Sequence, residues 1–313
     1  MFLPPERNNF LFITLSNIGD VLLTTPVLQF LHGYDTDARI DIIGDKRSSM
    51  LFRHCPYRGQ VYHKHKRRFL RGVPSLWFEL RRNRYDLVVD LRTDILARLV
   101  RADKRLGKTA GDEQCHAVEQ HFAAISPIAG GQEIPPVTLW LGQVDRDYAA
   151  RVCRQLPGNR WLCIGPGANW EKKIWPAEKY ALTADELRGR FDALVLLGND
   201  SDNRQAELVA GRVRLPCVNL CGRTTLLQAG AVMERMTLFL GNDSGLGHVA
   251  AAVGAPSFTL FGPGNPERYH PWGPRAAWLA APDGNIENIP VNIVVEKVRE
   301  HLTRISNPSL ILH

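Results

Sequence analysis

Three positions in the chain combine residue types that could handle an anionic ligand. Asp20 follows a short apolar run and Gly19, Lys173 precedes the pair Trp175-Pro176, and Asp243-Ser244 follows a second apolar run. A carboxylate accepts a proton from a hydroxyl that lies within hydrogen-bond reach. A lysine ammonium contributes a point charge to an anion site. Asp20 is therefore a candidate general base, and Lys173 and Asp243-Ser244 are candidates for anion binding.

Residues 240–263 form the stretch with the clearest local pattern. An apolar run ends at Gly241, a small-residue helix is expected over 245–253, and residues 257–261 predict a second strand. Asp243 or Ser244 could cap this helix, and Gly254 suits its C′ position. A strand, a turn and a helix N-terminus bring unpaired N–H groups together, which favours an anion. An ordinary strand–helix–strand crossover explains the same pattern.

Other interpretations stay open for the remaining candidates. Asp20 could simply cap the helix that follows it. Lys172 and Lys173 cannot be distinguished by chemistry, and either could be a solvent-exposed side chain. His248 lies about one turn into the small-residue helix, where it could touch a phosphate or a sugar, or serve only as a capping histidine.

Several common catalytic motifs are absent from the sequence. Neither GxGxxG nor GxxxxGK[ST] occurs at a strand-to-helix turn, and HExxH, GxSxG and an EF-hand loop do not occur. The acidic residues form no pair at an obvious metal position. We therefore expect no metal site and no cofactor.

Composition and length indicate a soluble globular protein. The 313 residues are 44% hydrophobic and 23% charged, which allows two domains of ordinary size. We see no signal peptide and no apolar stretch of membrane-spanning length. Six cysteines in a chain of this length do not indicate a disulfide scaffold. The expected location is the cytoplasm.

The net charge of +7 is concentrated in residues 51–84, which hold ten Lys and Arg against Glu79 alone. Aromatic residues among these charges suit an anionic lipid surface. Binding of nucleic acid is the alternative from a different class, although no nucleic-acid module is visible. A solvated helix face with a mobile loop is the third interpretation.

Strands alternate with helices along both halves of the chain, which predicts two doubly wound parallel sheets of the α/β class. Strands are expected over 10–15, 39–44 and 85–90, and again over 161–164, 193–197, 217–220, 238–240 and 257–261. Helices are expected over 21–31 and over 176–188 with Pro176 as the first helical residue. We place the domains at 1–142 and 143–313. A last helix spans about 291–303, and whether it packs back on the first domain is left open.

The segment 16–26, SNIGDVLLTTP, resembles the glycosyltransferase family of ADP-heptose:lipopolysaccharide heptosyltransferases, glycosyltransferase family 9. Segments 85–91, 166–176 and 241–263 agree with it in the same order. The last is the most specific, because its DSGLGH matches the family signature D-[ST]-G-x-x-H. Asn17 and Ser244 are conservative departures from the family's usual residues.

The resemblance implies a GT-B architecture, in which two Rossmann-like domains face an interdomain cleft, with the acceptor on the first domain and the nucleotide sugar on the second. It implies inverting, metal-independent transfer from an ADP-heptose-type donor, with Asp20 as the catalytic base. The donor-binding residues that it implies are Lys173, Asp243, Ser244, Gly245, His248 and, more loosely, Asp202.

The implied acceptor is the anionic lipopolysaccharide core, and the basic segment suits both this core and an anionic membrane surface. We assign the acceptor contacts to Lys64, Lys66, Arg67, Arg68 and Arg71. The expected protein is a cytoplasmic enzyme bound peripherally to the inner membrane, with no nucleic-acid partner. A different nucleotide sugar or glycan acceptor is the alternative within the same fold.

Overall fold

The computed structural model describes residues 7–63, 73–92, 96–108 and 114–307, and the side chains of these residues except 73–75. The chain divides into two compact units, Met1–Trp140 and Leu141–His313. This division lies two residues before the expected domain boundary. Each unit is described separately below.

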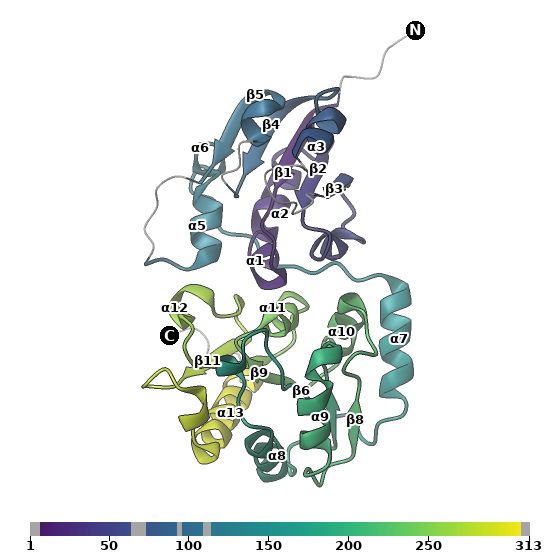
Figure 1. Ribbon diagram of the computed structural model, residues 1–313, viewed down its shortest axis with the longest axis vertical. Coiled ribbons are helices and arrows are strands. Elements are labelled where there is room, and N and C mark those ends of the chain that lie inside the picture. Colours follow the sequence, from purple (N-terminus) through teal and green to yellow (C-terminus); the bar gives the residue numbers. More distant parts are fainter. Residues whose placement is uncertain (1–6, 64–72, 93–95, 109–113, 308–313) are drawn as a thin grey trace. The chain divides into compact units, whose positions relative to one another are not determined.

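Unit 1 is built on a five-stranded parallel sheet with strand order β3-β2-β1-β4-β5 (Figure 1). Its strands are β1 (Asn9–Ile13), β2 (Arg39–Gly44), β3 (Arg58–His63), β4 (Arg84–Asp90) and β5 (Arg101–Gly107). Its helices are α1 (Ile18–Leu22), α2 (Thr25–Tyr34), η1 (Ser49–Phe52), α3 (Val73–Leu80), α4 (Leu96–Leu99), α5 (Ala117–Ala123) and α6 (Ser126–Ala129). The central strands are apolar and buried, because helices cover a parallel sheet on its faces.

The edge strands of unit 1 were not expected from the sequence. β3 reads RGQVYH and β5 reads RADKRLG, and most of their residues are exposed or half-buried. Edge strands commonly carry charged side chains, which discourage pairing with another chain. Their polarity therefore hid them from a search for apolar runs.

Unit 2 contains a six-stranded parallel sheet with strand order β11-β10-β9-β6-β7-β8 (Figure 1). Its strands are β6 (Trp161–Gly165), β7 (Ala193–Leu196), β8 (Cys217–Asn219), β9 (Leu238–Asn242), β10 (Ser257–Phe261) and β11 (Ala276–Ala280). Its helices are α7 (Gln143–Cys153), η3 (Glu171–Lys173), α8 (Ala177–Glu186), η4 (Asp200–Asp202), α9 (Asn203–Ala210), α10 (Leu226–Met233), α11 (Gly245–Ala252), α12 (Pro266–Tyr269), η5 (Ile286–Asn288) and α13 (Val291–Ser306).

Both sheets are doubly wound, as the alternation of strands and helices in the sequence predicts. Two such units are the components of the GT-B architecture. In each sheet the strand order reverses beside the first strand of the unit, between β1 and β4 in unit 1 and between β6 and β9 in unit 2. Ligands of open α/β sheets bind outside the carboxyl ends of the strands at this switch point. The fold therefore directs attention to the residues that follow β1, β4, β6 and β9.

Two helix predictions need correction. The helix expected over 21–31 is broken at Leu23 and Thr24, so that α1 and α2 are separate. Thr24 donates its hydroxyl to the Val21 carbonyl, and Pro26 then suits the first turn of α2. The helix expected from Pro176 begins instead at Ala177, with Pro176 as its N-cap.

The C-terminal helix α13 belongs to the core of unit 2. Its buried residues Val294, Val298 and Leu302 join the same hydrophobic cluster as Trp175 and Tyr180, and α13 packs beside α8. Within the described residues, we find no helix that combines the length and the apolar character needed to cross a membrane.

Candidate active site

An ion pair between Lys173 and Asp243 lies at the carboxyl edge of the unit 2 sheet. Lys173 Nζ is 2.5 Å from Asp243 Oδ2, and the two side chains are 26% and 12% exposed. Lys173 ends the short helix η3, and Asp243 directly follows β9. The two residues are 70 positions apart in the sequence, and the fold brings them together.

The structure separates the two lysines that the sequence leaves equivalent. The Lys172 ammonium lies 5.9 Å from the centre of the Trp170 ring, and no ion pair of Lys172 is found in the described part of the chain. Only the Lys173 ammonium reaches the end of β9. This agrees with Lys173, and not Lys172, as the candidate for phosphate binding.

Ser244 is the N-cap of α11, although its side chain does not cap the helix. Its backbone is extended, and neither it nor Asp243 provides a side-chain hydrogen bond to the first turn. The predicted N-cap position of Ser244 is therefore confirmed, but the expected hydrogen bond from its side chain to the first turn is not present among the described residues. The Ser244 hydroxyl is buried and has no hydrogen-bond partner among the described residues. Gly254 ends this element with a φ of 75°, as its expected C′ role requires.

The N-terminus of α11 therefore offers unpaired donors beside a lysine. The first N–H groups of a helix have no partner within the helix, and its dipole is positive at this end. Gly245 is the first residue of α11 and has no side chain to cover these groups. The arrangement can bind the oxygens of a phosphate or diphosphate.

His248 lies one turn into α11 and is only 7% exposed. Its ring is mostly covered by the protein, so at most its edge is available to a ligand. The packing of α11 on β9 and β10 fixes its position.

Asp202 lies at the ends of two neighbouring strands. A Cβ built on Gly167 would come within 2.0 Å of Asp202 Oδ1, and one built on Gly198 within 2.7 Å of Asp202 Cβ. The carboxylate therefore lies against the backbone that follows β6 and β7. Burial raises the pKa of Asp202, and a hydrogen bond from the Asn199 N–H partly opposes this.

Asn242 was not singled out as a site residue in the sequence, although its side chain connects two segments of the candidate site. It is the last residue of β9 and is fully buried. Its side chain bonds to the backbone after β6 and to the backbone beside Lys173. The position of Asn242 in the sequence could have identified it, because it is a polar residue at the end of an apolar strand and directly precedes Asp243.

In unit 1, Asp20 lies in the first turn of α1, just after β1. It is not the N-cap of that helix, which is Asn17, so the capping interpretation of Asp20 is wrong. Asn17 Nδ2 donates to Asp20 Oδ2 at 2.9 Å, and Oδ1 has no hydrogen-bond partner among the described residues. The half-buried carboxylate therefore keeps one oxygen available to accept a proton.

The end of β4 lies beside β1, the strand that precedes Asp20, at the switch point of unit 1. Asp90 pairs in register with Ile13, is 6% exposed, and accepts the Arg92 N–H at 2.8 Å. It is a second carboxylate at the carboxyl edge of this sheet.

The proposed acceptor residues Lys64, Lys66, Arg67, Arg68 and Arg71 lie outside the described residues. The described basic residues of the same segment are exposed arginines: Arg53, Arg58, Arg81, Arg82 and Arg84. Within unit 1, Arg84 pairs with Asp103 at 2.8 Å, and the Arg81 guanidinium lies 4.3 Å from the Phe78 ring centre.

The described side chains show no cluster of metal ligands, and the thiol nearest Asp202, Cys221, is not a nucleophile. Among these residues, no group of three or more His, Cys, Asp or Glu lies close enough to hold a metal ion. Burial, with smaller contributions from Asp202 and Cys217, raises the pKa of the Cys221 thiol to about 12. This thiol is therefore protonated near neutral pH and is not a nucleophile.

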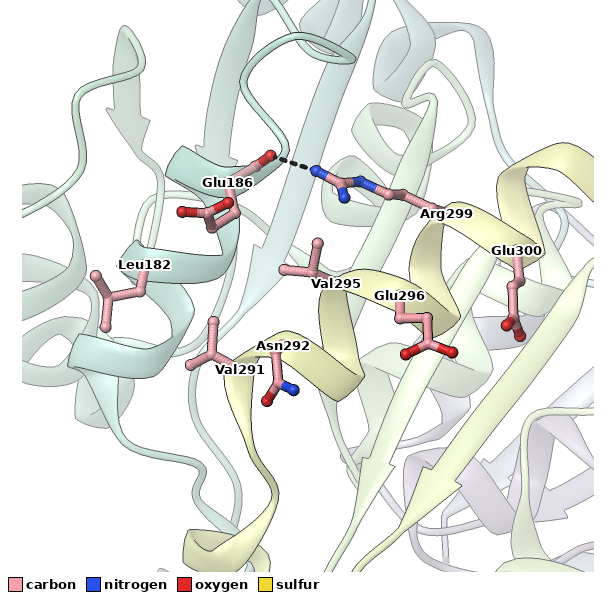
Figure 2. Close-up of a pocket in the computed structure, with 8 residues that line it drawn as sticks. All are labelled: Leu182, Glu186, Val291, Asn292, Val295, Glu296, Arg299 and Glu300. Atoms are coloured by element: carbon pink, nitrogen blue, oxygen red, sulfur yellow. Dashed lines mark hydrogen bonds between the residues drawn. The ribbon is translucent and has the colours of Figure 1, made fainter.

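A separate groove of about 800 Å³ lies between α8 and α13 (Figure 2). Arg299 crosses it and donates to the Glu186 carbonyl at 3.0 Å. Leu182, Val291 and Val295 line it together with acidic side chains. None of the candidate donor residues lines this groove, so it is not the donor site.

Comparison with known proteins agrees with the geometry. The family model for glycosyltransferase family 9 (heptosyltransferase) matches residues 73–288. Lipopolysaccharide heptosyltransferase 3 of Escherichia coli strain K12 is 26% identical over 91% of each chain.

Two solved structures share the fold. One is a family 9 glycosyl transferase from Veillonella parvula, with a TM-score of 0.85 and 21% identity over 95% of this chain and 97% of that chain. The other is the ADP-heptose lipopolysaccharide heptosyltransferase II of E. coli, with a TM-score of 0.80 and 22% identity over 96% of this chain and 100% of that chain.

Proposed function

Because the chain belongs to glycosyltransferase family 9, the heptosyltransferases, we propose that it transfers heptose from an ADP-heptose-type donor to the lipopolysaccharide inner core. The observation that carries this proposal is the Lys173–Asp243 pair beside the N-terminus of α11. The relatives named for lipopolysaccharide and ADP-heptose support the choice of substrates.

Unit 2 holds the donor in this proposal. The diphosphate lies at the N-terminus of α11, where the Gly245 turn offers N–H groups and the unpartnered Ser244 hydroxyl offers a further donor. Lys173 adds an ammonium group, whose charge the Asp243 carboxylate partly compensates. Asp202, placed against Gly167, lies where a carboxylate could accept hydrogen bonds from ribose hydroxyls.

Asp243 has two roles in this proposal, one toward Lys173 and one toward the donor sugar. It holds the Lys173 ammonium through the 2.5 Å contact, and it follows the strand end at which the sugar would lie. A carboxylate has several acceptor sites, so it can accept hydrogen bonds from sugar hydroxyls and from an ammonium together. We assign it to the donor sugar and to the orientation of Lys173.

The proposed reaction is an inverting displacement. Asp20 accepts the proton of the acceptor hydroxyl, the acceptor oxygen bonds to the anomeric carbon, and the bond from that carbon to the nucleotide diphosphate breaks. The electron pair of the broken bond leaves with the diphosphate. Lys173 and the amides of α11 stabilise this leaving group in the transition state. These groups supply the positive charge, so the proposed mechanism includes no metal step.

The acceptor half of the proposal rests on charge. The lipopolysaccharide core is anionic, and the segment 51–84 of unit 1 carries ten basic residues against one acidic residue. Lys64, Lys66, Arg67, Arg68 and Arg71 are the proposed contacts, with the exposed arginines of the same segment around them. The same charges would attract the cytoplasmic surface of the inner membrane, where we place the enzyme as a peripheral protein.

The test is a transfer assay with a panel of nucleotide sugars and truncated core acceptors, analysed by mass spectrometry. The proposal expects the acceptor to gain one heptose unit with ADP-heptose only. Transfer of a different sugar from a UDP or GDP donor would contradict the proposed donor, although the protein would still be a glycosyltransferase. No transfer to any core acceptor would overturn the proposed function.

The membrane assignment has its own test. Vesicles with anionic lipids should carry the protein upward in a flotation gradient, and the association should weaken as salt increases. Binding to nucleic acid in a gel shift, without flotation, would overturn the assignment in favour of a nucleic-acid partner.

A further inference from the structure

The side chain of Asn242 uses its entire hydrogen-bonding capacity inside unit 2. Its Oδ1 accepts the Trp175 backbone N–H at 3.0 Å and the Tyr180 hydroxyl at 2.8 Å. Its Nδ2 donates to the Pro166 carbonyl at 3.0 Å and to the Gly167 carbonyl at 3.3 Å. A carboxamide offers two acceptor lone pairs and two N–H donors, so nothing is left over for a ligand.

These partners fix which way the amide points. The Trp175 N–H can only donate, and the carbonyls of Pro166 and Gly167 can only accept. The oxygen must therefore face Trp175, and the nitrogen must face the backbone after β6. Asn242 is fully buried, so water cannot replace a missing partner.

Apart from Tyr180, the partners lie in segments that carry or contact a candidate donor residue. Trp175 lies two residues after Lys173, and Gly167 lies against Asp202. Asn242 itself precedes Asp243 and Ser244. The bonds to Pro166 and Gly167 cross the switch point between β6 and β9, since the strands pair up to Gly165 and Gly241.

The Trp175 side of the network is anchored independently. Trp175 is fully buried, its indole donates to the Ile289 carbonyl at 3.2 Å, and Gln205 donates to its backbone carbonyl at 3.2 Å. The segment after Lys173 is therefore held at several points. Asn242 binds it to the end of β9 and, through the same side chain, to the loop after β6.

We infer that Asn242 is a positioning residue that holds three donor-site segments, 166–167, 173–175 and 243–244, in register across the β6–β9 switch point. This inference rests on the proposed function, in which these segments bind the nucleotide diphosphate. Asn242 does not touch the donor. It acts through the backbone that carries Lys173, Asp243 and Gly167.

A purely structural role is the competing explanation, and Tyr180 provides a matched control. The Tyr180 hydroxyl bonds to the same Oδ1 but comes from α8, which carries none of the candidate donor residues. Tyr180→Phe removes one buried hydrogen bond of the network and leaves the bonds to Trp175, Pro166 and Gly167 in place. This variant should lower the free energy of unfolding without speeding amide hydrogen exchange in the donor-site segments.

The diagnostic variant is Asn242→Asp, which preserves shape. Its carboxylate still accepts from Trp175 and Tyr180, but its second oxygen now faces the carbonyls of Pro166 and Gly167. When ionised, this oxygen donates nothing, and when protonated it donates to one carbonyl only. At least one of the two carbonyls therefore loses its buried partner, and the loop after β6 is held less firmly. Should Asn242→Asp fail to fold, Asn242→Ser removes the amide without adding a charge and takes its place.

The experiment combines two measurements on the full chain: amide hydrogen exchange without ligand, and calorimetric binding of ADP. Asn242→Asp should speed exchange in 165–175 and 243–248 and weaken ADP binding by about tenfold, as the loss of one or two buried hydrogen bonds predicts. Tyr180→Phe should leave exchange in these segments unchanged and ADP affinity within about twofold.

Unchanged exchange in 165–175 and 243–248 in the Asn242 variant would overturn the inference, as would equal loss of ADP affinity in Tyr180→Phe. Failure of the wild-type protein to bind ADP would instead overturn the proposed function, since the exchange measurement needs no ligand. The two failures are thus distinguishable.

Discussion

Lys173 and Asp243 meet at the carboxyl edge of the unit 2 sheet, with Nζ 2.5 Å from Oδ2. The contact joins the segment that follows β6 to the residue that follows β9. A diphosphate that reaches Lys173 therefore arrives beside a carboxylate. The position of Asp243 then determines whether the Lys173 ammonium points toward the diphosphate.

Gly264 limits the position of Asp243. A Cβ at Gly264 would come within 2.5 Å of Asp243 Oδ2 and 3.1 Å of Phe261 Cδ1. Gly264→Ala should push the carboxylate away from Lys173 and weaken ADP-heptose binding by about tenfold, roughly the contribution of one charge-assisted hydrogen bond. Isothermal titration calorimetry measures this directly.

Gly189→Ala is the matched control in the same unit. A Cβ there meets nothing within 4 Å, so the affinity should stay at the wild-type value. Equal affinity of Gly264→Ala and Gly189→Ala would show that the geometry of Asp243 does not matter for donor binding.

Asp20 should be required for the chemical step. Asp20→Asn keeps the size of the side chain but cannot accept a proton, so kcat should fall by at least about 100-fold. The affinity for the donor and the melting temperature should stay close to wild type. Asp20 lies in unit 1, and among the described side chains it accepts a hydrogen bond from Asn17 alone.

Asp37→Asn serves as the control for Asp20. Asp37 is an exposed carboxylate before β2, at the opposite edge of the same sheet. Its replacement should leave kcat unchanged. If Asp20→Asn kept half or more of the wild-type kcat, Asp20 could not be the general base.

His301 should make the stability of unit 2 depend on pH. It is buried on α13, and burial, followed by the Arg304 charge, lowers its pKa to about 4. The folded protein therefore keeps His301 neutral where the unfolded chain, with a pKa near 6.5, binds a proton. The stabilisation is fully present above about pH 6.5 and is lost as the pH falls toward 4.

Between pH 7.5 and pH 5 this linkage lowers the free energy of unfolding by about 2 kcal/mol. Urea denaturation across that range measures it. His301→Leu removes the titrating group and should flatten the dependence. An equally steep dependence in His301→Leu would assign the effect to other groups.

The sequence predicted the central strands well, because buried strands leave a local signal. Buried strands such as β9 and β10 read as apolar runs, and Gly254 takes the left-handed conformation that its position after a helix indicates. The edge strands of unit 1, β3 and β5, were missed because their charged residues conceal the alternating pattern of a strand, whereas β8 at an edge of the unit 2 sheet was predicted.

Contacts between distant segments could not be read from the sequence. Lys172 and Lys173 have the same chemistry, and only the fold shows which of them reaches Asp243. The network of Asn242 joins residues that are 62 to 76 positions away. Such contacts depend on which strands are neighbours, and no local pattern encodes that.

The adjacent lysines offer the most direct test of the central claim, that unit 2 binds the diphosphate of an ADP-sugar through Lys173. Calorimetric titration of ADP-heptose into wild type, Lys173→Ala and Lys172→Ala compares two variants with the same loss of charge. We predict that Lys173→Ala weakens binding by about tenfold or more and that Lys172→Ala stays within about twofold. Wild-type affinity in Lys173→Ala, or equal losses in both variants, would contradict the account.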